Sequence, residues 1–153
     1  MEICQDYEEL FLKLNEHKIK YLVVGAHAVM YYTEPRYTKD IDVWIVSDFN
    51  DVHSIHQALK DFGAPMQNFK PDDFNNKNLI FQIGVAPVRI DILTNIPGPS
   101  FKEAWRNKVK TKYGKADIYL LSMKDLIKAK EASGRDQDKI DVKNLQKIKR
   151  PKK

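Results

Sequence analysis

Two aspartates interrupt an apolar segment, DIDVWIV, at residues 40–46. Successive side chains of a β-strand point to opposite faces, so Asp40 and Asp42 share one face and the apolar residues between them take the other. Carboxylates this close repel each other unless a proton or a cation lies between them, and hard oxygen ligands favour Mg²⁺ or Mn²⁺. The segment therefore predicts a core strand with a metal site on its polar face.

A third aspartate, Asp91, lies in another apolar segment, VRIDIL, where a carboxylate that faces the core needs a partner. If this segment neighbours DIDVWI, three carboxylates converge into a ligand set suited to phosphoryl transfer. Arg89 shares the face of Asp91 and could pair with it or with a phosphate. Two alternatives stay open. Asp40 and Asp42 could end a strand and face solvent, and Asp91 could be a structural partner of Arg89.

The segment VVGAHAVMYY places Gly25 and Ala26 between a short apolar strand and a helix. Free backbone N–H groups and the dipole at a helix start favour an anion such as a nucleotide phosphate. Small residues let the backbone approach such a ligand closely. The segment predicts an anion site beside the paired carboxylates, with a simple turn glycine as the alternative.

Hydrophobic periodicity predicts alternating helices and strands in the first part of the chain. Apolar residues at helical spacing indicate helices over about residues 5–17, 26–32 and 48–62. Short β-branched segments indicate strands over residues 20–24 and 40–46. NLIFQIG and VRIDILT, joined through VAP, are interpreted as a hairpin whose second strand carries Asp91.

Turn and capping signals organise the remaining residues. Gly114 marks the turn of a second hairpin. Two serines lie three residues before an acidic residue and are expected to start helices, Ser100 with Glu103 and Ser122 with Asp125. The second of these helices should end at Gly134, and residues 136–148 should form the last helix. The expected fold is α/β (α+β), a small mixed sheet flanked by helices, with C-terminal helices.

Composition favours a globular intracellular protein, and 153 residues suit one domain. Hydrophobic residues make up 42% and charged residues 31%. The lone Cys4 suits a reducing compartment, and neither a signal peptide nor an apolar run of about 20 residues is evident, so we expect a cytoplasmic protein without membrane association. The net charge of +5 gathers partly in the tail KIKRPKK. Such a run is usually a solvated end, although it would also suit a nucleic acid.

The combination of these motifs resembles the nucleotidyltransferase superfamily of the DNA polymerase β type in a minimal form. The resemblance rests on VVGAHAVMYYTEPRYTKDIDVWI and VRIDIL. More narrowly, GAHAV, PRYTKDIDVW, FQIGVAPVRIDILTNIPG and GRDQDKIDVKNL resemble small prokaryotic nucleotidyltransferases akin to toxin components of type IV toxin-antitoxin systems, such as AbiEii. The resemblance covers about residues 20–146.

The resemblance implies roles for particular residues. Asp40 and Asp42 would bind the metal ions, and Asp91 would be the third ligand and help to activate the acceptor hydroxyl. The residues implied to contact the nucleotide are Gly25, Ala26, Arg36, Thr38, Lys130 and Arg135. An ordinary surface loop is the alternative for Arg36 and Thr38, and solvated helix charges for Lys130 and Arg135.

Four further residues near these motifs are ambiguous. Asp138 and Asp141 are interpreted as structural partners of Arg135. His27 and Trp44 are interpreted as packing residues or as neighbours of the nucleotide. Ala26 stands where many members of the superfamily have serine or glycine, so a hydroxyl that would bond a phosphate is missing.

The expected activity is transfer of a nucleoside monophosphate from a nucleoside triphosphate to an acceptor hydroxyl on tRNA or other RNA, a protein or a small molecule. We expect one nucleotidyltransferase domain over residues 1–153, with a core at about 5–95, a C-terminal helical part at about 120–149 and a basic tail at 150–153. A DxD-dependent glycosyltransferase and a nucleotide-binding regulatory protein without turnover are the alternatives.

Overall fold

A computed structural model describes residues 3–38, 40–84 and 88–149 of the chain. The predicted VAP connection at residues 85–87 and the predicted basic tail at residues 150–153 lie outside these residues. Among the described residues, no helix is both long enough and apolar enough to cross a membrane.

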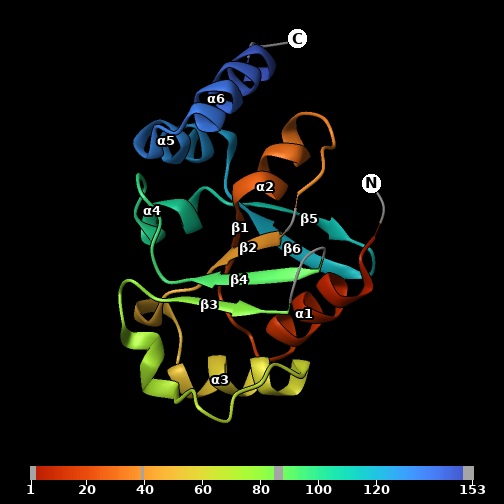
Figure 1. Ribbon diagram of the computed structural model, residues 1–153, viewed down its shortest axis with the longest axis vertical. Helices are drawn as coiled ribbons and strands as arrows, with labels where there is room; N and C mark the ends of the chain where they lie inside the picture. Colours follow the sequence, from red (N-terminus) through yellow and green to blue (C-terminus); the bar gives the residue numbers. More distant parts are fainter. Residues whose placement is uncertain (1–2, 39, 85–87, 150–153) are drawn as a thin grey trace.

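One mixed sheet organises the described part of the chain (Figure 1). Its strands lie in the order β3-β4-β2-β1-β6-β5. Their bounds are β1 Leu22–Val24, β2 Asp40–Trp44, β3 Ile80–Ile83, β4 Arg89–Leu93, β5 Val109–Tyr113 and β6 Ala116–Leu120. β2 runs parallel to β4 and antiparallel to β1, and the predicted hairpins β3–β4 and β5–β6 are both antiparallel. The strand order confirms that the two aspartate-bearing segments are neighbours.

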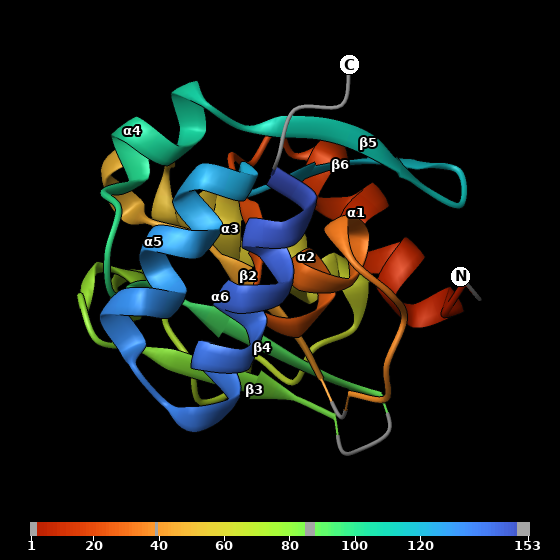
Figure 2. The same cartoon turned by 90° about the horizontal axis from the view of Figure 1, so that it is seen from above.

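Helices cover both faces of this sheet. Their bounds are α1 Gln5–Glu16, α2 Gly25–Tyr32, α3 Val52–Phe62, α4 Phe101–Arg106, α5 Met123–Ser133 and α6 Asp136–Lys149. Figure 1 shows α3 at the bottom of the molecule with α1 above it, and α5 and α6 at the top. Seen from above, α5 and α6 lie over the sheet beside α2 (Figure 2). The predicted α/β architecture with C-terminal helices is confirmed.

Strand alternation divides the buried side chains into two cores. Ile41 and Val43 of β2 pack with α1 and α3. Trp44 packs on the opposite face, with residues of α2, α4, α5 and α6. Because side chains alternate along β2, Asp40 and Asp42 also face the C-terminal helices. The burial pattern therefore places the carboxylates between the sheet and α5–α6.

Capping residues set the helix bounds. Ser100 accepts a hydrogen bond from the Glu103 N–H, and Ser122 accepts one from the Asp125 N–H. The helix predicted over residues 48–62 is instead a 3₁₀ turn, η1 Ser47–Phe49, followed by α3. The division arises because Asp51, in an extended conformation, caps α3 by accepting from the His53 N–H. A second 3₁₀ turn, η2 Pro71–Asn75, was not predicted from the sequence.

Candidate active site

The three predicted acids lie together on adjacent parallel strands. The register pairs Asp42 of β2 with Asp91 of β4, and Asp40 with Arg89. Each of the three aspartates offers one carboxylate oxygen, and these oxygens lie within 4.8 Å of one another. Hard oxygen donors at this separation suit a divalent cation such as Mg²⁺. Asp40 and Asp42 are half-buried and Asp91 is buried, so the three carboxylates do not simply face solvent.

Burial and repulsion within this carboxylate triad (Asp40, Asp42 and Asp91) oppose the ionisation of Asp42 and Asp91. Burial raises the pKa of Asp42 to about 7, with further contributions from Asp40 and Asp91. Burial and the neighbouring Asp40 carboxylate also raise the pKa of Asp91, against the opposing effect of Arg89. A bound cation would reverse both shifts, because positive charge favours the ionised acids.

Arg89 supplies the nearest positive charge to the triad. Its Nη2 donates to Asp40 Oδ2 at 2.6 Å and reaches Asp91 Oδ2 only at 3.5 Å. Asp91 Oδ1 lies 3.4 Å from Arg89 Nε, but the alignment does not make a hydrogen bond, and both atoms are buried without one. Arg89 is therefore bound mainly to Asp40, and the unsatisfied oxygen of Asp91 fits a metal ligand better than a purely structural ion-pair partner.

The predicted phosphate turn passes directly over Asp42. β1 ends at Val24, whose partner in the register is Asp42, and Gly25 opens α2 with φ of +69°. A methyl group added at Gly25 would collide with the Asp42 carboxylate. The N-cap residue, Val24, makes no side-chain hydrogen bond to the first turn of α2, which contains Ala26. Backbone N–H groups at this helix start are thus available to an anion next to the triad.

A cavity of about 250 Å³ adjoins the turn and the triad. Gly25, Asp42, Lys130 and Arg135 all line it. Four of the predicted site residues therefore share one cavity. Its wall also includes residues 95–97, which sequence reasoning missed. Their position directly after the Asp91 strand was the available signal, because ligands of open α/β sheets bind outside the carboxyl ends of strands.

Buried acids of α6 hold the basic side chains of the cavity. Lys130 Nζ lies 3.1 Å from Asp138 Oδ1 and 3.2 Å from Asp141 Oδ2. Arg135 Nε donates to Asp138 Oδ2 at 2.9 Å, which confirms the predicted pairing of these two residues. Burial opposes ionisation of Asp138, but hydrogen bonds from Arg135 and Lys130 outweigh it and hold the pKa of Asp138 well below its usual range.

Arg36 and Thr38 lie in the segment that connects α2 to β2. Arg36 pairs with Asp141 through Nη1 at 2.6 Å and Nη2 at 3.2 Å. The prediction that Asp141 partners Arg135 is therefore wrong, since the ion-pair partners of Asp141 are Arg36 and Lys130. Thr38 Oγ1 donates to the Asp40 backbone carbonyl at 3.2 Å. Neither side chain lines the cavity beside Gly25.

Trp44 and His27, each interpreted as a packing residue or as a neighbour of the nucleotide, both make packing contacts. Trp44 is 3% exposed and meets the Phe101 ring edge-on at 5.1 Å. His27 meets the Tyr7 ring edge-on at 5.5 Å, and burial lowers its pKa. Neither lines the cavity beside Gly25, which favours the packing interpretation, and His27 Nε2 and Trp44 Nε1 are buried without a hydrogen-bond partner.

Comparisons with known proteins agree with this arrangement. The family model described as "Nucleotidyltransferase of unknown function (DUF6036)" matches residues 1–150. No curated protein matches the chain. The crystal structure of the lincosamide antibiotic adenylyltransferase LnuA with lincomycin bound is 19% identical, with a TM-score of 0.61, and the match covers 97% of this chain and 99% of that one. An antigenic nucleotidyltransferase-like protein from Paracoccidioides brasiliensis is 14% identical, with a TM-score of 0.52, and the match covers 95% of this chain and 77% of that one. At these identities the structural likeness establishes the fold.

Proposed function

The chain belongs to the family of nucleotidyltransferases of unknown function (DUF6036), and we propose that it transfers a nucleoside monophosphate from a nucleoside triphosphate to an acceptor hydroxyl. The observation that carries the proposal is the carboxylate triad, whose oxygens lie within 4.8 Å of one another beside the Gly25 turn. The proposal treats residues 1–153 as one domain and places the reaction in the cytoplasm, where nucleoside triphosphates and Mg²⁺ are available.

Asp40, Asp42 and Asp91 would hold Mg²⁺ or Mn²⁺. When bound, the metal supplies positive charge that neutralises the triphosphate and stabilises the charge that develops on phosphate oxygens. The fit rests on two features of the chain, the shared oxygen-donor set and the buried Asp91 Oδ1 without a hydrogen-bond partner. Both features are explained if the triad is a ligand set.

The residues around the cavity would bind and orient the triphosphate. The first N–H groups of α2, at Gly25 and Ala26, would donate to phosphate oxygens without the hydroxyl that serine would add. Lys130 and Arg135 line the same cavity as Gly25 and would also contact the phosphates. Arg36 and Thr38 would stabilise the segment that leads into Asp40, since neither lines this cavity.

Asp91 would accept the proton of the acceptor hydroxyl. The acceptor oxygen then attacks the α-phosphorus, a new P–O bond forms, and the bond to the β-phosphate breaks to release pyrophosphate. The carboxylate of Asp91 offers two oxygens, so one could face the metal while the other accepts this proton. The acceptor is RNA, a protein or a small molecule of the kind named for LnuA, and a toxin role suggested by the narrower resemblance belongs to the same proposal.

A labelling experiment tests the proposal. Each α-labelled nucleoside triphosphate is incubated with the protein, Mg²⁺ and cell extract, and the RNA, protein and small-molecule fractions are separated. We expect label in one fraction, pyrophosphate release, and loss of both in Asp91→Asn. A lack of labelling by wild type, with nucleoside diphosphate released from a sugar nucleotide instead, would favour a glycosyltransferase. Nucleotide binding without any transfer would favour the regulatory alternative.

A further inference from the structure

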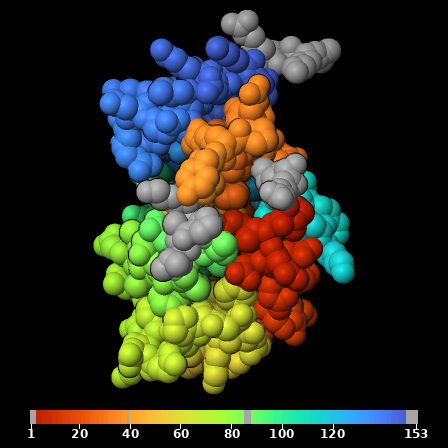
Figure 3. All heavy atoms as spheres, turned by 45° about the vertical axis from the view of Figure 1, so that its right-hand side comes forward, coloured from red at the N-terminus to blue at the C-terminus, as the bar shows by residue number. Residues whose placement is uncertain are grey.

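A second and larger cavity lies on α6. It has a volume of about 610 Å³ and is formed by residues 33–36 of the α2–β2 connection and by Asn144, Lys147 and Ile148 of α6. Figure 3 shows this connecting segment packed directly against α6. We propose that this cavity is the acceptor site and that it binds the single-stranded end of a nucleic acid. The inference rests on the proposed function, since it names the acceptor class of that reaction.

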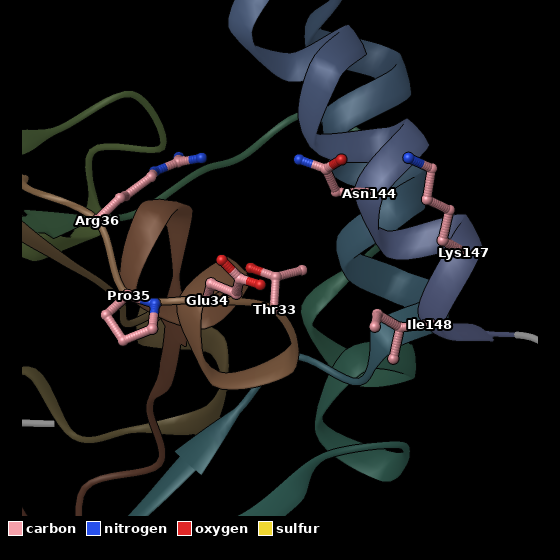
Figure 4. A pocket seen from close by; sticks show the side chains of 7 residues that line it. All are labelled: Thr33, Glu34, Pro35, Arg36, Asn144, Lys147 and Ile148. Carbon is pink, nitrogen blue, oxygen red and sulfur yellow. The ribbon is translucent and has the colours of Figure 1, made fainter.

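Hydrogen-bonding groups from opposite walls face this cavity. Figure 4 shows Arg36 extending from the connecting segment toward Asn144 on α6, with Lys147 one turn further along. The bidentate pair with the fully buried Asp141 fixes the Arg36 guanidinium and occupies only two of its five N–H donors. The remaining donors and the Lys147 ammonium suit phosphate oxygens, and Glu34 suits the amino groups or hydroxyls of a base and sugar.

A row of lysines leads along α6 to the same cavity. Lys139, Lys143 and Lys147 are all exposed and recur every four residues, which puts them about 6 Å apart along the helix. None of the three has a carboxylate partner among the described residues, whereas the exposed Lys77 and Lys112 each have one. Uncompensated positive charge in a line is the electrostatic surface that follows a phosphate backbone.

An exposed aromatic side chain follows Arg36 in the connecting segment. Tyr37 is 75% exposed, and it directly follows Arg36, whose side chain is bound to α6 through Asp141. The basic residues of α6 have no interleaved aromatic residue in the sequence, but the fold supplies one from a segment about 100 residues away. Aromatic rings beside a basic groove are the stacking platforms of proteins that bind single strands.

The acceptor cavity lies within reach of the triad. Arg36 precedes Asp40 by four residues, so their Cα atoms are at most about 14 Å apart. Asp141 also contacts Lys130, which lines the smaller cavity beside Gly25, so a buried ion network joins the two cavities. The proposal places the terminal hydroxyl of a strand bound along α6 at a nucleotide held beside the triad.

The test is oligonucleotide binding measured by fluorescence anisotropy, in EDTA and without nucleotide. Labelled single-stranded RNA, single-stranded DNA and the matching duplex are titrated over a range of salt concentrations. We expect single strands to bind more tightly than the duplex. Comparison of the RNA and DNA affinities shows whether the site prefers ribose or deoxyribose. Replacing Lys139, Lys143 and Lys147 together with Gln should reduce the slope of log K against log salt by about 2, at about 0.7 for each phosphate contact.

Matched variants separate this surface from general charge. Lys18, Lys60 and Lys115 are exposed elsewhere, and their combined replacement by Gln, with the same charge change, should leave the slope unchanged. Tyr37→Ala should weaken binding at least about fivefold through loss of base stacking, whereas Tyr37→Phe should retain it. Equal effects of the two lysine sets, or duplex bound as tightly as single strand, would overturn the inference.

The two proposals fail in different ways. Asp42→Asn should abolish nucleotidyl transfer but retain oligonucleotide binding, because Asp42 does not line the larger cavity. Transfer to a protein or small molecule without oligonucleotide binding would overturn the acceptor assignment and leave the proposed function standing. Oligonucleotide binding without transfer to any acceptor would support the binding surface and overturn the proposed function.

Discussion

Asp42 should make the metal-free protein less stable as pH rises. Its folded pKa of about 7 exceeds its usual 3.8, so the folded state binds its proton more tightly than the unfolded chain does. The stability associated with protonated Asp42 is fully present below about pH 4 and is lost as the pH rises to about 7. At about 1.4 kcal/mol for each tenfold difference in proton affinity, the upper limit of the loss is about 4 kcal/mol.

Asp42→Asn removes this titration while keeping the shape of the side chain. In EDTA at pH 8 the variant should melt up to about 8–16 °C above wild type, because each kcal/mol shifts the melting temperature by about 2–4 °C at this chain length. At pH 4 the two proteins should melt at similar temperatures. Melting by calorimetry or circular dichroism between pH 4 and 8 gives the comparison.

A control variant and the addition of Mg²⁺ test whether the pH dependence of stability comes from Asp42. Asp48→Asn changes an exposed carboxylate outside the triad and should keep the wild-type pH dependence. Excess Mg²⁺ at pH 8 should stabilise wild type and leave Asp42→Asn almost unchanged, because a ligand stabilises only the folded state that binds it. Identical pH profiles for wild type and Asp42→Asn in EDTA would refute the argument that burial and the neighbouring acids raise the pKa of Asp42.

Two further substitutions, each with a control substitution, test the surroundings of the triad. Gly25→Ala should destabilise the protein by at least about 1 kcal/mol and abolish nucleotide binding, because it adds left-handed backbone strain and a collision with Asp42. Gly63 also has a positive φ but has open space around it, so Gly63→Ala should lose only the stability that backbone strain costs. This control should bind nucleotide normally in calorimetry. Asp141→Asn should cost about 3 to 5 kcal/mol in urea unfolding because it breaks a buried ion network. Lys77→Gln removes an exposed ion pair and should cost less than about 1 kcal/mol. Equal losses of stability in Asp141→Asn and Lys77→Gln would contradict the view that the Asp141 network is buried.

Local patterns predicted much of the fold. Alternation in DIDVWI correctly divided β2 between two cores, and the serine caps located the starts of α4 and α5. These signals are short-range, since they depend on side-chain direction and on backbone groups within one turn. The division of the predicted helix at Asp51 was missed because a capping side chain and an apolar periodicity compete over the same residues.

The contacts of the candidate site were less predictable. The Arg36–Asp141 pair joins residues 105 positions apart, and nothing in the local sequence distinguishes it from a pair between Asp141 and Arg135. The convergence of Asp91 with Asp40 and Asp42 required β4 to lie beside β2, a matter of strand order that periodicity does not specify. The α6 cavity likewise depends on how the α2–β2 connection meets a helix far along the chain.

Opposite charges around the smaller cavity are kept apart by their own partners. Asp42 lies close enough to Lys130 for the ammonium to lower its pKa, yet Lys130 Nζ is bound to Asp138 and Asp141 on α6. Without those two acids, the shortest route to neutrality would be a direct pair between Lys130 and Asp42, which would close the space between the triad and α5. Each basic side chain is already paired with an acid of α6, and the cavity is lined by Asp42 together with the paired Lys130, Arg135 and Asp138. We infer that Asp138 and Asp141 position the cations of the cavity, so that a metal and a triphosphate together can complete the charge balance.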